Sequence, residues 1–308
     1  MKSIPYIGNS LEHCLKFSLF TNSGCYKKFL RENLPDDIRQ IGLLVMGQVI
    51  ERVILKNGNT GSNSDLRWGN MDKVPWWRLR CEDDVLPNAV SMIAELLRLD
   101  NRGFTLNRAT ENKIVVTCRH RAILIASILK TKGIPCRVRS GFASYFPGFE
   151  GSWDHWINQY WDAKQKRWVT IDVEGCFENL RFDAFDIPKG KFDFPADTWL
   201  GIRKGLLDEN KFINAGGFKG LEPVLWAIFY DFHSLMNNEI RYLHTPNYIW
   251  NKFDKLTEND FLEIDELAEL LSNPDANFRK LKEVWIEKKK FRILSGSLIS
   301  DRDHTKWK

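Results

Sequence analysis

Residues 117–130 read TCRHRAILIASILK, a run that is rich in good helix formers and apolar beyond its first turn. Gly133 and Pro135 follow the run, as is typical just past the C-terminal end of a helix. The run is too long for an ordinary strand, so it predicts a helix that is apolar on almost every face. Such a helix is usually buried.

Cys118 falls in or beside the first turn of this predicted helix. A helix N-terminus offers free backbone N–H groups and a partial positive charge, which favour a thiolate over a thiol. A lone cysteine at such a place is more often a packing residue. Cys118 is therefore a candidate nucleophile only if a base and a carboxylate join it.

The composition describes a globular protein of 308 residues, 43% hydrophobic and 28% charged, which is enough for one large domain or two small ones. The net charge of +5 is small and spread out, so we expect no nucleic-acid partner. No apolar stretch is long enough to span a membrane, and the N-terminal residues do not resemble a secretory signal. These features favour a cytoplasmic protein without membrane contact.

The cysteines show no Cys-x-x-Cys pair and no histidine spacing that would build a zinc site. We interpret all six as reduced thiols, and five of them as packing residues: Cys14, Cys25, Cys81, Cys136 and Cys176.

The remaining patterns divide the chain into helices around an extended centre. Helices are predicted in residues 35–55, 86–99, 223–237, 258–271 and 276–291, and a loop in residues 57–70. Extended segments are predicted in residues 136–144, 155–161 and 167–173, the last two joined by the polar residues 162–166 as a hairpin. The pattern predicts one α+β domain over residues 1–308, with the cysteine helix packed on an antiparallel sheet and extra helices at both ends.

His155 and Asp172 lie on the two arms of the predicted hairpin. They enclose an even number of residues, so they can pair directly, with both side chains on one face of the sheet. If the buried helix packs on that face, Cys118 meets His155. A nucleophilic thiol needs such a base, and the base needs a third group to orient it.

The chain here resembles the transglutaminase-like superfamily of papain-like Cys-His-Asp thiol enzymes, and within it a bacterial branch. The matching text is TCRH at 117–120, GIPCRV at 133–138, DHW at 154–156 and WVTID at 168–172. The motif core covers about residues 108–176, with helical extensions in residues 1–107 and 177–308. The resemblance implies that Cys118 is the nucleophile, His155 the general base and Asp172 its orienting carboxylate.

The resemblance further implies an enzyme that attacks a carboxamide or peptide bond through a cysteine thioester, giving hydrolysis or acyl transfer to an amine. The expected partner is a peptide, protein or small amide substrate. We expect no cofactor and no metal, since the chain has no EF-hand-like acidic loop. The alternative is a catalytically silent peptide- or protein-binding module on the same fold.

Other residues are weaker candidates. The backbone N–H of Cys118 is one candidate oxyanion donor, and the second is open among Trp68, Trp76 and Trp77, each more easily explained as packing. For three further residues we favour lesser roles: His120 as a structural or rim residue, Glu174 as a weaker competitor of Asp172, and His233 as a satisfied buried histidine.

Overall fold

The computed structural model describes residues 5–52, 73–79, 82–146, 150–242 and 244–295. Helix makes up 46% of it and strand 15%, which confirms the α+β class. The helices are α1 (Pro5–Leu15), α2 (Lys27–Asn33), α3 (Ile38–Met46), α5 (Glu82–Val85), α6 (Ala89–Leu99), α7 (Cys118–Thr131), α8 (Pro195–Arg203), α9 (Leu221–Leu235), α10 (Glu258–Leu271) and α11 (Phe278–Glu287). The strands are β1 (Val49–Glu51), β2 (Ile114–Val116), β3 (Cys136–Ala143), β4 (Ser152–Asp162), β5 (Arg167–Ile171), β6 (Phe192–Asp193) and β7 (Phe212–Ile213).

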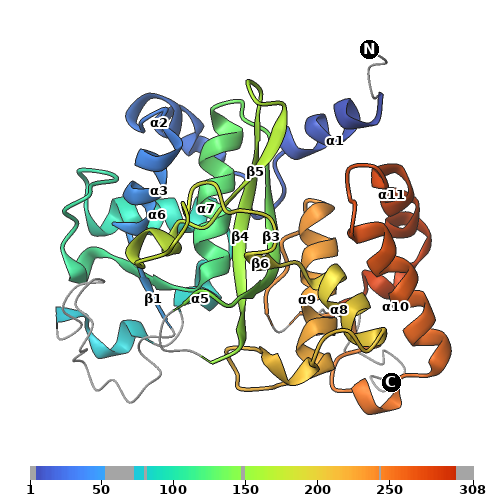
Figure 1. Cartoon of the computed structure of the whole chain (residues 1–308). Coiled ribbons are helices and arrows are strands. Elements are labelled where there is room, and N and C mark those ends of the chain that lie inside the picture. Colours follow the sequence, from blue (N-terminus) through green and yellow to red (C-terminus); the bar gives the residue numbers. More distant parts are fainter. Residues whose placement is uncertain (1–4, 53–72, 80–81, 147–149, 243, 296–308) are drawn as a thin grey trace, which may run out of the picture.

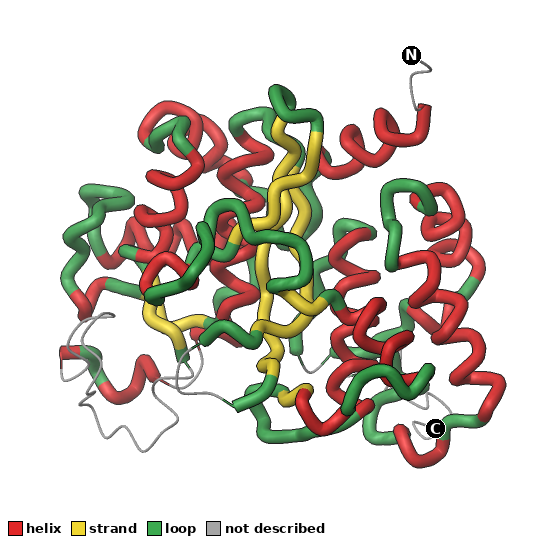
Figure 2. Tube along the Cα trace, in the orientation of Figure 1, coloured by secondary structure: helices red, strands yellow, loops and turns green. Residues whose placement is uncertain are grey.

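The central sheet has the strand order β5-β4-β3-β6, and β7 pairs with β4. Strand β4 runs antiparallel to both β3 and β5, with Ser140 opposite Trp156 and Asn158 opposite Ile171. Figure 2 shows these strands in the middle of the molecule with helices on both sides. The predicted hairpin is therefore confirmed, and it lies in the sheet that supports the cysteine helix.

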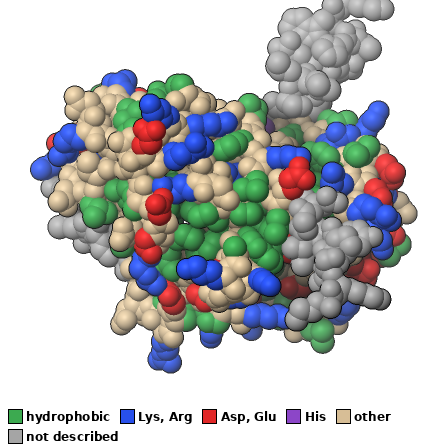
Figure 3. Space-filling model, turned by 90° about the horizontal axis from the view of Figure 1, so that it is seen from above, with side chains coloured by type: hydrophobic (Ala, Val, Ile, Leu, Met, Phe, Trp, Pro, Cys, Tyr) green, Lys and Arg blue, Asp and Glu red, His purple; other side chains and the backbone are tan. Residues whose placement is uncertain are grey.

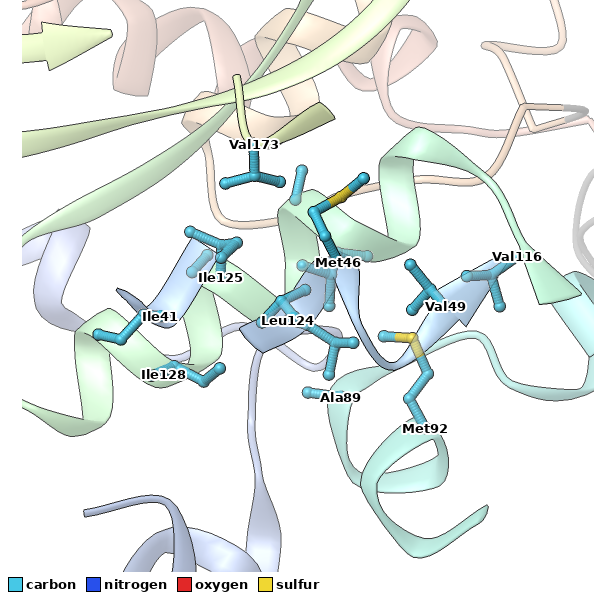
Figure 4. Packing of buried hydrophobic residues seen from close by; sticks show 14 of the residues in the cluster. Ile41, Met46, Val49, Ala89, Met92, Val116, Leu124, Ile125, Ile128 and Val173 are labelled. Carbon is cyan, nitrogen blue, oxygen red and sulfur yellow. The ribbon is translucent and has the colours of Figure 1, made fainter. Parts of the chain in front are cut away.

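The two larger hydrophobic cores of the described residues lie on either side of the sheet. In Figure 1, α2, α3, α6 and α7 lie to the left of the strands, and α8 to α11 lie to the right. The first core joins α7 to α3, α6 and the short β1–β2 pair; Figure 4 shows residues of these elements, such as Met46, Met92 and Leu124, packed together. The second core is formed mainly by α8, α9, α10 and α11. The extra helices at both ends of the chain thus enclose the sheet.

Helix α7 is the element that the sequence predicted most directly. It begins at Cys118 and is buried from Arg119 to Thr131. Gly133 has a φ of 79°, which a glycine adopts without steric cost, and the N–H of Ile134 donates to the Leu129 carbonyl beyond the helix end. The prediction of a buried helix with Cys118 in its first turn is confirmed.

The helix predicted over residues 35–55 is wrong from residue 47 to residue 52, because α3 ends at Met46, and residues 53–55 lie outside the described residues. Val49, which continues the helical spacing, lies in β1 and pairs in parallel with Ile114. A Cβ at Gly47 would lie 3.2 Å from the carbonyl oxygens of Leu44 and Thr105, so the chain passes this point tightly. A long-range strand pairing therefore overrides the local periodicity.

The other predicted helices are present with shifted ends. Helix α6 begins three residues later than expected, because Asn88 caps its start, in a capping box with Ser91. Helix α10 matches residues 258–271, and Thr257 and Asp260 form a capping box at its start. Helices α1, α2, α5 and α8 were not predicted, and the loop predicted at residues 57–70 lies outside the described residues.

The cysteines of the described residues are free thiols, as expected, but one of them is not a packing residue. Within the described residues the free cysteines are Cys14, Cys25, Cys118, Cys136 and Cys176. Cys14 and Cys136 are buried as expected of packing residues, but Cys25 is exposed, so its assignment to packing is wrong. Cys81 lies outside the described residues.

Figure 3 shows one face of the molecule, where Lys and Arg side chains are mixed with Asp and Glu and hydrophobic side chains gather near the centre. On this face the positive charge is therefore dispersed, in line with the small net charge of +5. Across the described residues, no helix combines the length and the apolar character that crossing a membrane requires.

Candidate active site

Cys118 is the first residue of α7, with extended Thr117 as the preceding cap residue. The Thr117 hydroxyl lies 2.8 Å from Nδ1 of His120, so His120 supports the first turn, as its structural interpretation required. Further along the helix, the side-chain amide of Asn158 on β4 donates to the carbonyl of Ala122 at 2.9 Å. These contacts fix the start of α7 against the strand that carries His155.

His155 and Asp172 meet, but not by direct pairing. His155 on β4 lies opposite Gly141 of β3, and Asp172 is the first residue after β5. The hairpin register pairs Asn158 with Ile171, so Asp172 falls two positions short of facing His155. The expected direct pairing is therefore wrong. A shift of two residues keeps both side chains on one face, and Nε2 of His155 donates to Oδ2 of Asp172 at 3.1 Å.

The turn of the hairpin explains this register. Asp162 pairs with Arg167, and its carboxylate accepts hydrogen bonds from the backbone N–H groups of Lys164 and Gln165 at 2.8 and 3.0 Å. Such side-chain bonds to the following backbone fix a turn locally. They place the turn one residue later than direct pairing of His155 with Asp172 would need.

Asp172 is held by several donors as well as by His155. The Tyr145 hydroxyl donates to Oδ2 at 2.8 Å, and the backbone N–H of Glu174 donates to Oδ1 at 3.0 Å. Burial raises the pKa of the Asp172 carboxyl, but His155, the Tyr145 hydroxyl and nearby Arg121 outweigh burial and lower the pKa below its usual value. Asp172 is therefore a buried and fully ionised acceptor at neutral pH.

The imidazole of His155 is only 5% exposed, and Phe146 packs on it edge to face at 5.0 Å between ring centroids. Burial alone lowers the pKa of His155, but the charge and hydrogen bond of Asp172, together with those of the Cys118 side chain, raise the pKa well above its usual value. Since Nε2 is engaged with Asp172, Nδ1 is the nitrogen left for the sulfur. The three predicted residues thus lie together, with His155 in the middle.

Tyr242 is a site residue that the sequence reasoning missed. Its hydroxyl lies 2.8 Å from the sulfur of Cys118, although the two residues are 124 positions apart. Burial and the neighbouring Cys118 raise the pKa of Tyr242 well above its usual value, so the phenol keeps its proton and can donate it to a thiolate. No spacing signal connects Tyr242 to the motif core.

Arg119, the buried residue after Cys118, holds the segment of residues 239–242, which carries Tyr242. Arg119 donates to the carbonyl oxygens of Glu239 and Ile240, the latter at 2.9 Å. The Tyr242 ring also packs on Trp156 of β4, with ring centroids 5.8 Å apart. The start of α7 therefore fixes the place where residues 239–242 approach the sulfur of Cys118.

A second set of charges surrounds the same cluster. Arg121 is 2% exposed and forms ion pairs with Glu51 of β1, at 2.6 Å, and with Glu174. Glu174 also lies 3.9 Å from Nε2 of His155, farther than Asp172 at 3.1 Å. Burial raises the pKa of Glu174 to about 7. The structure thus places Glu174 near the imidazole but behind Asp172, in line with its weaker expected role.

The remaining candidates have other surroundings. His233 is fully buried, and its two ring nitrogens meet the Phe291 carbonyl at 2.8 Å and the Asn238 amide at 2.9 Å, which confirms a satisfied buried histidine. Trp77 is 62% exposed, and Trp68 lies outside the described residues, as does the side chain of Trp76. The question of a second oxyanion donor among these tryptophans stays a prediction.

A cavity of about 250 Å³ lies beyond Asp172, between α3 and the loop of residues 175–185, and Arg39, Gly175 and Cys176 are among the residues that line it.

Within the described residues, no group of three or more His, Cys, Asp or Glu side chains is arranged to hold a metal ion.

The comparison with protein families agrees with this geometry. Residues 105–173 match the family model of the transglutaminase-like superfamily, and this segment contains Cys118, His155 and Asp172. No match was found for the chain among curated proteins or among solved structures. Residues 105–173 are thus similar to the core of the transglutaminase-like superfamily.

Proposed function

We propose that this protein is a cysteine-dependent enzyme that attacks a carboxamide or peptide carbonyl through Cys118. The observation that carries the proposal is the buried imidazole of His155, which hydrogen-bonds Asp172 at 3.1 Å and also interacts with the Cys118 side chain. A raised pKa of His155 favours its protonated form, and an imidazolium beside the sulfur stabilises a thiolate. Asp172 is the group that orients the ring.

The chemistry follows from these positions. The thiolate of Cys118 attacks the carbonyl carbon and forms a tetrahedral intermediate, whose oxyanion is near the N-terminus of α7. The carbon–nitrogen bond breaks as His155 gives its proton to the leaving amine, and a thioester remains on the sulfur. Water or a second amine then attacks the thioester while His155 takes up its proton. The carbon–sulfur bond breaks, the acid or the new amide leaves, and the thiolate–imidazolium pair is restored.

Water is the acceptor that we favour, because the sequence indicates no second-substrate site. The substrate is a peptide, a protein or a small amide, and the cytoplasmic location remains a prediction. The alternative function is a binding module that keeps the fold without turnover. The two functions differ in whether the Cys118 sulfur is reactive.

A thiol-reactive probe tests this difference. Iodoacetamide near neutral pH should label Cys118 faster than the exposed Cys25, which is an ordinary thiol in the same chain. His155→Ala should remove this advantage and leave the labelling of Cys25 unchanged. Labelling of Cys118 that is no faster than that of Cys25 would favour the binding module.

A second experiment identifies the acceptor. A pool of glutamine-containing peptides is incubated with the protein, with and without a primary amine, and analysed by mass spectrometry. Acid products or shorter peptides indicate hydrolysis, and amine adducts indicate acyl transfer. The Cys118→Ala protein is the control, and products that persist with it would come from a contaminating enzyme.

A further inference from the structure

Arg121 occupies a position that links α7 to both sides of the candidate site. It lies three residues after Cys118, so the two side chains leave the same face of the helix. Its two terminal nitrogens meet different carboxylates: Nη1 lies 2.6 Å from Glu51, and Nη2 pairs with Oε2 of Glu174. A buried guanidinium thus spans two acidic side chains from separate strands or loops.

The Glu174 oxygen that pairs with Arg121 also faces the imidazole. Oε2 of Glu174 lies 3.9 Å from Nε2 of His155, the same nitrogen that donates to Asp172 at 3.1 Å. The backbone N–H of Glu174 is bonded to Oδ1 of Asp172, so the Glu174 backbone is fixed and only its side chain can turn. Two carboxylates therefore compete for one N–H group.

We propose that Arg121 is a positioning residue that holds Glu174 away from His155 and so assigns the imidazole N–H to Asp172. The proposal rests on the proposed function, because it concerns the base of that same reaction. A guanidinium fork can bond two carboxylates at once, whereas a lysine ammonium is a single point charge. Without the fork, Glu174 can draw the imidazole toward itself and misalign its other nitrogen from the sulfur.

Several charged or titratable groups face this cluster and share its electrostatics. They are Cys118 and Arg121 from α7, Glu51 from β1, Tyr145 after β3, His155 from β4, Asp172 and Glu174 after β5, and Tyr242. Removing the charge of Arg121 would disturb all of them at once. Arg121→Lys keeps the charge and removes only the fork, so it separates position from charge.

The experiment measures the rate at which iodoacetamide alkylates Cys118 in four variants. They are R121K, E174Q, the double variant R121K/E174Q and the matched double variant R121K/E51Q. We expect R121K to lower the rate about tenfold, within the roughly hundredfold loss that a misplacement of about 1 Å can cause. The loss should be larger near pH 8 than near pH 6, because a carboxylate competes for the imidazole only when it is ionised.

Rescue distinguishes positioning from a structural role. Glutamine at position 174 cannot compete as an anion, so R121K/E174Q should recover a rate near that of E174Q. The neutral change at Glu51, on the other arm of the fork, should not restore the rate. A rate for R121K equal to that of the wild type, or equal rescue by both double variants, would overturn the proposal.

Thermal unfolding shows whether each variant folds. If R121K does not fold, Arg121→Gln is compared with R121Q/E174Q and R121Q/E51Q. These two double variants carry the same net charge and differ only in which carboxylate is neutralised, so rescue by E174Q alone still separates position from charge. The two proposals fail in different ways. A wild-type Cys118 no more reactive than Cys25 contradicts the proposed function, whereas a fast wild-type Cys118 that R121K leaves unchanged contradicts only the role of Arg121.

Discussion

Helices α7 and α9 are both buried and flank the sheet, but the buried polar side chains near them differ in their hydrogen-bond partners. On α9, Asp231 accepts two hydrogen bonds from Arg139, at 2.7 and 2.8 Å, and His233 lies between a carbonyl and an amide. At the start of α7, one imidazole faces the Asp172 carboxylate, the Cys118 sulfur and, at 3.9 Å, Glu174. On α9, Asp231 and His233 each meet matching polar partners. At the start of α7, several acidic groups face the same imidazole of His155.

This difference gives the two buried histidines opposite titration behaviour. Burial lowers the pKa of His233 to about 4, because its neutral partners do not compensate the lost hydration. Burial acts in the same direction on His155, but Asp172 and Cys118 reverse it and raise the pKa. Burial alone therefore does not identify a functional histidine; the charge of its neighbours does.

Asp172→Asn should have the largest effect of any single substitution in either region. Asparagine can donate to Nε2 of His155, which leaves the ring proton on the nitrogen that faces the sulfur. We expect turnover of an amide substrate to fall by up to about 10⁴-fold, as the same replacement in a Ser-His-Asp triad can do. Mass spectrometry of the peptide pool measures it, with His233→Gln as the buried-histidine control. A loss below about tenfold would remove Asp172 from the mechanism.

Near α9, breaking the ion pair of Arg139 and Asp231 should lower the stability of the fold and leave the activity unchanged. Asp231 is fully buried, so Asp231→Leu leaves the guanidinium of Arg139 without its main partner. We expect a loss of about 3–5 kcal/mol in the free energy of unfolding, measured by urea denaturation. The double variant R139M/D231L should recover most of it, because both charges are then removed. A small effect of D231L alone would contradict this account.

The pH dependence of stability should separate the two histidines. The pKa of His233 is about 4 in the folded state and 6.5 without burial, so between these values only the unfolded chain binds a proton. Stability therefore falls as the pH drops from about 6.5 to about 4, and this group accounts for about 3 kcal/mol of the fall. Urea denaturation of His233→Gln should show a smaller fall.

His155 provides the opposite case for the same measurement. Because its folded pKa is raised, its contribution to stability is complete below about 6.5 and is lost as the pH rises through the raised value. The stability difference between the wild type and His155→Gln should therefore shrink with rising pH. If the stability difference between wild type and variant changed with pH in the same direction for both histidines, their surroundings would not be distinct.

The sequence predicted the elements whose signals are local. The patterns at residues 117–130 and 258–271 both identified their helices, since each signal lies within the helix itself. It failed at Val49, because a three-residue strand that pairs with Ile114 has no local signature. The hairpin was predicted correctly, but the register that pairs His155 directly with Asp172 was wrong, because the bonds of Asp162 in the turn decide the register.

The candidate site divides in the same way. Cys118, His155 and Asp172 could be predicted because they lie within one short segment with a recognisable order. Tyr242 could not, since only the folded chain brings it to the sulfur. Arg121 gave no functional signal either, because a charged residue in an apolar helix indicates a buried ion pair only once its partners are known.

Tyr242→Phe should have the smallest effect and gives the sharpest view of the sulfur itself. Phenylalanine keeps the ring that packs on Trp156 and Tyr230, so thermal stability should not change. Only the hydroxyl 2.8 Å from the Cys118 sulfur is lost. A hydrogen bond to a charged group contributes about 1.5 kcal/mol, so alkylation of Cys118 below neutral pH should slow about tenfold. A faster reaction would mean that the hydroxyl covers the sulfur instead of stabilising its anion, and an unchanged rate would mean that it does neither.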